Sequence, residues 1–196
     1  MISIDKLQNI PRQATPDFAN PLALLTHCHR KIENQLSALE QVAEKVSEGS
    51  LDDRLSAFFA IDIARAHFAG PLLKHTEDEE ISLFPRLRAR AGKGASEIVG
   101  ALDELETEHR VLEELHQEFE LVAAELHRDC SSQAGKIERL DDLVEALCEL
   151  YRPHMQIEDE LIFPAAAQLL LPSDIHAIGE EMRARRRLTL QKTVRN

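Results

Sequence analysis

Apolar residues recur along most of this chain at alternating steps of three and four positions. In the first such stretch the repeating positions are Leu22, Leu25, His29, Ile32, Leu36, Leu39, Ala43 and Val46. Steps of three and four place side chains on one face of an α-helix, so the pattern predicts an amphipathic helix over about residues 22–46. A histidine, His29, occupies one position of this apolar face.

Three further stretches repeat the pattern. A second helical region is predicted over about residues 51–91, with Ser50 as its N-cap and a kink or short break at Ala-Gly-Pro, residues 69–71. A third helix is predicted over about residues 95–127 and a fourth over about residues 136–161. Four long amphipathic helices joined by short turns predict an all-α fold, an up-down-up-down four-helix bundle.

The ends of the chain differ from this central part. Residues 1–21 are polar and contain three prolines, which predicts an N-terminal arm. Residues 22–171 are predicted to form the bundle, and residues 172–196 a basic tail that includes a short helix. The basic tail residues are Arg183, Arg185, Arg186, Arg187, Lys192 and Arg195. We expect the tail to dock on the acidic surface of its own chain or to be solvated, with partner binding as the alternative.

Composition and charge narrow the class of protein. A chain of 196 residues with 4% aromatic residues and a formal net charge of −12 is consistent with one helical domain. The negative charge argues against nucleic acid or an anionic membrane as partner. Three cysteines without Cys-x-x-Cys spacing argue against a disulfide framework or a thiolate zinc site. We find no signal peptide or membrane-spanning run, so a cytoplasmic protein is expected.

Two segments of the chain are closely similar to each other. "HTEDEEISLFP" at residues 75–85 aligns without gaps with "HMQIEDELIFP" at residues 154–164. "CHRKIENQL" aligns in the same way with "EHRVLEELH", which matches His29 with His109. The two alignments have nearly the same offset along the chain. They therefore predict that the bundle arose from a duplicated helical hairpin.

The repeated residues are candidate metal ligands. Counting residues to each turn places the four histidines His29, His75, His109 and His154 at about the same height in an antiparallel bundle. Glu79 and Glu158 follow His75 and His154 by one helical turn and share their faces. Two buried carboxylates require compensating positive charge. Imidazole and carboxylate without thiolate suit iron, manganese or zinc, and six ligands suit two metal ions.

This ordered set resembles the hemerythrin-like, or HHE cation-binding, four-helix bundles over about residues 22–170. That family has a histidine on its first and third helices and His-x-x-x-Glu on its second and fourth. Phe-Pro follows the motif in both copies, as Phe84-Pro85 and Phe163-Pro164 do here. The resemblance implies a non-heme di-iron centre bridged by an oxo or hydroxo group and by the two glutamates. The four histidines would then be terminal ligands, with manganese or zinc as less favoured metals.

The chain also departs from the family. Oxygen-carrying hemerythrins have a further histidine four residues after the one on the third helix, where this chain has Glu113. Reversible oxygen carriage is therefore not expected. The sequence leaves open whether Glu33, Glu113 or His116 joins the site. The related iron-centre repair proteins carry an N-terminal cysteine, which residues 1–21 do not contain.

We therefore expect a di-iron protein that binds or senses oxygen, nitric oxide or peroxide, or handles iron, rather than an enzyme. Two other functions stay open. The same centre would support an enzyme that turns over peroxide or nitric oxide, or a metal-stabilised bundle would serve as an interaction module. A buried His/Glu network without metal is the structural alternative, and the oligomeric state is not defined by the sequence.

Overall fold

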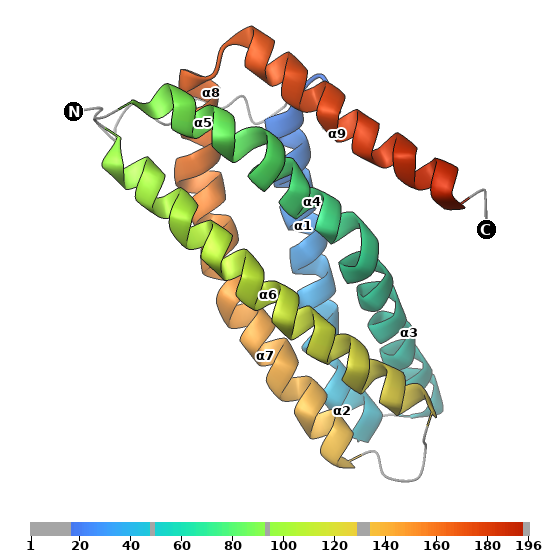
Figure 1. Ribbon diagram of the computed structural model, residues 1–196. Helices are drawn as coiled ribbons and strands as arrows, with labels where there is room; N and C mark the ends of the chain where they lie inside the picture. Colours follow the sequence, from blue (N-terminus) through green and yellow to red (C-terminus); the bar gives the residue numbers. More distant parts are fainter. Residues whose placement is uncertain (1–16, 48–49, 93–94, 129–133, 194–196) are drawn as a thin grey trace. The chain divides into compact units, whose positions relative to one another are not determined.

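The computed structural model describes residues 17–47, 50–92, 95–128 and 134–193 (Figure 1). In these four ranges the chain is helical apart from short turns and contains no strand. The all-α class expected from the spacing of apolar residues is confirmed. The part of the predicted arm that precedes Asp17, and the tail residue Arg195, lie outside the described ranges.

The first half of the chain forms α1 (Pro21–Leu39), α2 (Val42–Ser47), α3 (Leu51–His67), η2 (Phe68–Leu72), α4 (Leu73–Glu77), η3 (Asp78–Leu83) and α5 (Phe84–Ala91). The second half forms α6 (Ser96–Arg128), α7 (Ala134–Ile157), η4 (Glu158–Ile162), α8 (Phe163–Leu169) and α9 (Pro172–Thr193). The η segments are π-helical. A π-helix is a wider turn with hydrogen bonds from residue i to residue i−5, and such segments occur frequently at functional sites.

The second helical region begins as the sequence predicts. Ser50 caps α3, its side chain accepts a hydrogen bond from the Asp53 N–H, and the Asp53 side chain accepts from the Ser50 N–H. At Ala-Gly-Pro the chain stays helical instead of breaking, and Pro71 lies inside η2. Proline lacks an N–H group and crowds the carbonyl four residues earlier, so a wider turn accommodates it.

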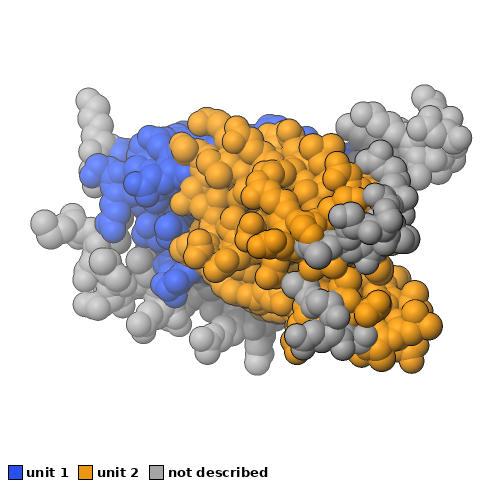
Figure 2. Space-filling model, turned by 90° about the horizontal axis from the view of Figure 1, so that it is seen from below, with its two compact units in different colours: residues 1–29, 73–106, 155–196 blue, residues 30–72, 107–154 orange. Residues whose placement is uncertain are grey.

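Two compact units share the chain (Figure 2). Unit 1 comprises residues 1–29, 73–106 and 155–196, and unit 2 comprises residues 30–72 and 107–154. The core of unit 1 consists of Leu25, Leu83, Phe84, Leu87, Leu102, Leu105, Ile162, Phe163, Ala165, Ala166, Leu170, Ile178 and Met182. The last two residues belong to α9, so the C-terminal helix is an integral part of unit 1.

Unit 2 has its own buried residues, and most come from the apolar positions of the three-four pattern. They include Ile32, Leu36, Leu39, Ala57, Ile61, Ala64, Phe68, Leu112, Phe119, Ala123, Leu140, Leu143, Leu147 and Tyr151. The α3 helix contributes Ala57, Ile61 and Ala64 to this core. Its opposite face carries exposed Leu51, Leu55 and Phe59. In the first helix, the three-four pattern therefore identified the buried face, which includes Ile32, Leu36 and Leu39.

Three further sequence-based expectations concern cysteines, membranes and segment boundaries. Cys28 and Cys148, the cysteines within the described ranges, are not joined in a disulfide, while Cys130 lies outside those ranges. Among the helices that the structure describes, none combines the length and apolar character needed to cross a membrane. The division into residues 1–21, 22–171 and 172–196 stays a prediction, although the helix of the tail is longer than expected, at 22 residues.

Candidate metal site

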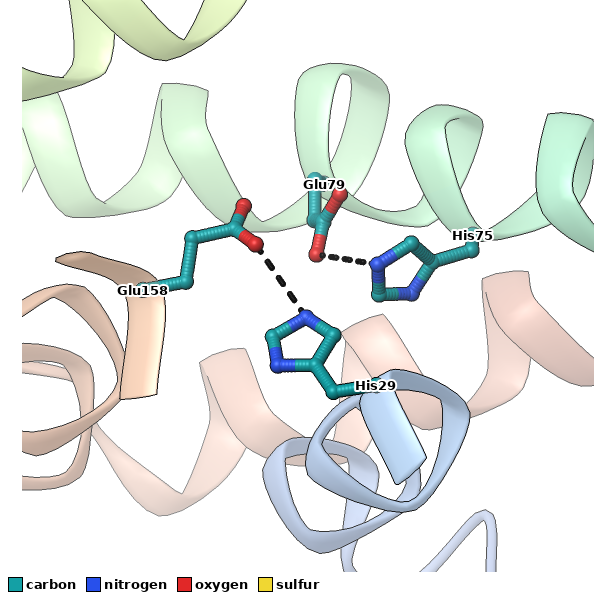
Figure 3. Close-up of side chains that lie close together, drawn as sticks. All are labelled: His29, His75, Glu79 and Glu158. Carbon is teal, nitrogen blue, oxygen red and sulfur yellow. Dashed lines mark ion pairs between the residues drawn. The ribbon is translucent and has the colours of Figure 1, made fainter. Parts of the chain in front are cut away.

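Four of the six predicted ligands meet in unit 1. His29 comes from α1, His75 from α4, Glu79 from η3 and Glu158 from η4, and the four side chains point toward one another (Figure 3). They are almost fully buried, with exposed fractions of 4%, 3%, 0% and 0%. One nitrogen or oxygen atom from each residue lies within 4.8 Å of the others. That span is typical of ligands that share a metal ion at about 2 Å each.

Each histidine of the cluster lies against one glutamate. His29 Nε2 is 3.1 Å from Glu158 Oε2, and His75 Nε2 is 3.2 Å from Glu79 Oε1. The two imidazole rings lie edge to face, with centroids 5.0 Å apart. The first of these ion pairs joins residues that are far apart in the sequence, so folding of unit 1 is what assembles the site.

The electrostatics of the cluster favour a bound cation. Burial, and then the charge of neighbouring Glu158, raise the pKa of Glu79 well above its ordinary value. Burial alone would lower the pKa of His29, but the carboxylates of Asp159 and Glu158 outweigh it and raise the pKa to about 9. Two buried carboxylates thus draw positive charge to one place. A metal ion would supply that charge, and the nitrogen and oxygen atoms of the cluster fit iron, manganese or zinc.

In both repeats, Phe-Pro directly follows a π-turn, η3 or η4. The N–H of Phe84 donates to the carbonyl of Glu79, and the N–H of Phe163 donates to the carbonyl of Glu158. Each of these bonds connects the residue before proline to a motif glutamate. Pro85 and Pro164 have no N–H to continue an α-helical ladder, and in both repeats the phenylalanine before the proline closes a π-turn at the motif glutamate.

Asp159 is a part of the site that the sequence analysis missed. Its Oδ2 lies 3.2 Å from His29 Nδ1, and its Oδ1 accepts a hydrogen bond of 3.0 Å from Thr26 Oγ1. A carboxylate on Nδ1 orients an imidazole and leaves Nε2 for a metal ion. The signal in the sequence is the acidic residue directly after Glu158, but its histidine partner lies near the opposite end of the chain.

The other two predicted ligands, His109 and His154, lie together in unit 2. Both are buried, and their ring centroids are 4.8 Å apart. His154 Nδ1 lies 2.7 Å from Glu108 Oε2. This contact resembles that of Asp159 with His29, and Glu108 is likewise a residue that the sequence analysis did not identify.

The residues that the sequence left open have other partners. Glu33 Oε1 lies 3.1 Å from Arg152 Nη2, and Glu113 is exposed and accepts a hydrogen bond from Gln117. His116 stacks on Phe68, and its Nε2 lies 3.2 Å from the Tyr151 hydroxyl. Burial, and then the charge of His67, lower the pKa of His116 to about 4. None of these contacts places the three residues among the four clustered ligands of unit 1.

The fold and the cluster define an all-α protein with a buried histidine and carboxylate cluster that could hold a metal ion. The family model of the hemerythrin HHE cation binding domain matches residues 20–166, and the chain belongs to that family. A second match covers residues 102–189, in agreement with the internal repeat. A comparison with curated proteins finds no match.

Proposed function

We propose that this protein holds a non-heme di-iron centre, and that it uses the centre to bind or sense a small ligand or to handle iron. Oxygen, nitric oxide and peroxide are the ligands we propose. The observation that carries the proposal is the buried cluster of His29, His75, Glu79 and Glu158, whose ligand atoms lie within 4.8 Å of one another. Membership of a cation-binding family agrees with it.

In this proposal His109 and His154 would complete the ligand set, and Glu79 and Glu158 would be the carboxylates that hold both irons. Support comes from the burial of both histidines and from Glu108, which occupies Nδ1 of His154 and leaves Nε2 for a metal. When bound, iron would supply the position at which a small molecule is coordinated. Carboxylates on Nδ1 orient the imidazoles of His29 and His154, and Phe163 packs on His29.

The surroundings of His29 support a ligand of only a few atoms. Phe163 stacks on the His29 ring with centroids 5.3 Å apart, and Phe163 itself is fully buried. The ligands of the cluster are at most 4% exposed. A substrate with a bulky organic part would have to displace this core, whereas a diatomic molecule or peroxide requires little space.

The metal content of the protein tests the proposal. Elemental analysis of protein expressed with iron should give about two irons per chain, as for carboxylate-bridged bundle sites. Glu158→Ala should lose most of the iron. Glu160→Ala is the matched control, because Glu160 lies on the same segment and is exposed. Folded wild-type protein with little or no iron would contradict the di-iron centre.

A second measurement separates binding from turnover. Reduced, iron-loaded protein is titrated with nitric oxide or peroxide, and consumption of the ligand is followed with time. A binding or sensing protein should saturate near one equivalent per centre. Continued consumption far beyond that amount would instead identify an enzyme that uses the same centre.

A further inference from the structure

The C-terminal helix α9 contacts the segment that carries Glu79. It packs on η3 and α4 within unit 1. Figure 1 shows α9 beside the segment that begins at α4. Ile178 and Met182 are fully buried where α9 joins the core. This part of α9 therefore packs on its own chain, where it reaches a segment of the candidate metal site.

Two arginines of α9 bind one buried acid of η3. Asp78, with no exposed surface, accepts a hydrogen bond from Arg185 through Oδ1 and one of 2.8 Å from Arg186 through Oδ2. Arg185 also donates to Ser82, which is itself fully buried. A buried carboxylate held by two guanidinium groups is strongly coupled to them, because removing either partner leaves uncompensated charge.

A second set of contacts joins α9 to η3 and to α5, which follows η3 in the chain. Ser82 donates a hydrogen bond of 2.6 Å to Glu181 Oε2, and Arg86 Nη2 lies 2.7 Å from Glu181 Oε1. Asp78 immediately precedes Glu79 and Ser82 follows it within the same turn, and both are turned toward α9. Contacts with α9 hold the side of the π-turn that carries Asp78 and Ser82. The Glu79 side chain lies on the other side and points toward His29 and His75 (Figure 3).

The two repeats differ at these positions. When the two His-x-x-x-Glu motifs are aligned, Asp78 corresponds to Ile157 and Ser82 corresponds to Leu161. Ile157 and Leu161 pack against the apolar core of unit 1. The first π-turn therefore has a polar face where the second has an apolar one, and α9 supplies the arginines that this polar face requires.

We propose that α9 positions Glu79 for metal binding, with Arg185 and Arg186 as positioning residues that act through Asp78. This inference rests on the proposed metal centre. It adds α9, which lies outside both His-x-x-x-Glu motifs, to the parts of the chain that shape the site. The π-turn departs from the regular α-helical hydrogen-bond ladder, and the contacts of Asp78 and Ser82 with α9 would set where the Glu79 carboxylate lies.

The test compares metal binding by the full chain and by two variants of this network. The double variant Arg185→Ala, Arg186→Ala removes both guanidinium groups, and Asp78→Asn keeps the shape of the acid while removing its charge. Arg187→Ala is the control, because Arg187 is the next arginine of α9 and is exposed. Ferrous iron and cobalt(II) are the probes. Competition with a chelator gives the dissociation constant, and the visible spectrum of bound cobalt(II) reports ligand geometry.

We expect both variants to bind metal about 10–100-fold more weakly than wild type and to show a changed cobalt(II) spectrum. Arg187→Ala should match wild type. Arg185→Lys, Arg186→Lys, which restores charge without the forked geometry, should recover part of the affinity. Combining the Ala and Asn changes should cost less than the sum of their separate effects, because the residues act as one unit.

Three outcomes would overturn the inference in distinguishable ways. Wild-type affinity and spectrum in both variants would refute the positioning role and leave the proposed function intact. A lower unfolding midpoint of the metal-free variants, with unchanged affinity and spectrum, would show that α9 has a structural role alone. Wild-type protein that binds neither metal would refute the proposed function, and the inference with it.

Discussion

Asp159 Oδ2 lies 3.2 Å from His29 Nδ1, while the other carboxylate oxygen of Asp159 accepts a hydrogen bond from Thr26. The two partners belong to α1, and Asp159 follows the candidate ligand Glu158 in η4. One acid therefore contacts the His29 ring and lies next to Glu158 in the chain. It connects candidate ligands that come from two distant parts of the sequence.

Replacing Asp159 should weaken metal binding without removing a ligand. We expect Asp159→Ala to lower the affinity for iron about 10–100-fold, because the imidazole loses the partner that orients it. Competition with a chelator measures the effect. Glu160→Ala, on the next residue, serves as the control and should bind as wild type. Unchanged affinity in Asp159→Ala would show that Asp159 does not orient His29.

The wide turns give a prediction about proline. Pro164→Ala restores the missing N–H and allows a regular α-helical bond across η4, so the carbonyl and side chain of Glu158 would be turned from their present positions. We expect weaker iron binding with little change in the unfolding midpoint of the metal-free protein. Pro71→Ala is the matched control, because Pro71 lies in η2, which contains no predicted ligand. Equal iron binding by both variants would contradict this role for Phe-Pro.

Much of the site was predictable because its ligands follow the helical period. His29 and His109 occupy apolar-face positions, and the repeated His-x-x-x-Glu places a carboxylate one turn after a histidine. Burial of these residues follows directly from the same period that forms the core. A duplicated pattern also distinguishes ligands from isolated core histidines. The structure confirms the all-α fold and gathers four of the six residues into one cluster in unit 1.

The remainder depends on contacts that a helical period does not encode. The regular α-helical period cannot indicate a π-turn, so η3 and η4 were not expected. Glu108 and Asp159 have ordinary positions among many acids, and only the fold brings them to a histidine. The basic tail predicted docking on an acidic surface, but Asp78, the acid it reaches, is fully buried.

The contact between Gly179 and Phe18 gives a prediction about stability. A Cβ atom on Gly179 would overlap the backbone oxygen of Phe18, and backbone yields less readily than a flexible side chain. We expect Gly179→Ala to lower the free energy of unfolding by about 1–3 kcal/mol. Gly100→Ala is the control, and it should change the free energy of unfolding in the opposite direction. Its Cβ would meet nothing within 4 Å, so it should raise stability by about 0.4–1 kcal/mol. Chemical denaturation measures both, and equal stability of the two variants would contradict the contact.

His116 gives a prediction about acid stability. Its folded-state pKa of about 4 lies below the ordinary value of 6.5, because burial disfavours the charged ring. Folding therefore favours neutral His116, and this contribution is fully present above pH 6.5 and is lost as the pH falls from 6.5 to 4. We expect His116→Gln to lose less stability over that range than wild type, by an amount on the order of 1–3 kcal/mol. Parallel curves of unfolding free energy against pH would contradict it.

Glu33 lies on the same helix as His29, but its contacts are those of a surface ion pair. Its carboxylate is 42% exposed, accepts a hydrogen bond from Ser37 and lies 3.1 Å from Arg152. We expect Glu33→Gln to keep the full iron content and to change the free energy of unfolding by less than about 1 kcal/mol, with a smaller change at high salt. Glu79→Gln is the comparison, since its buried carboxylate is a proposed ligand and its iron content should fall. Elemental analysis of the two variants measures their iron content, and loss of iron from Glu33→Gln would show that Glu33 is a ligand.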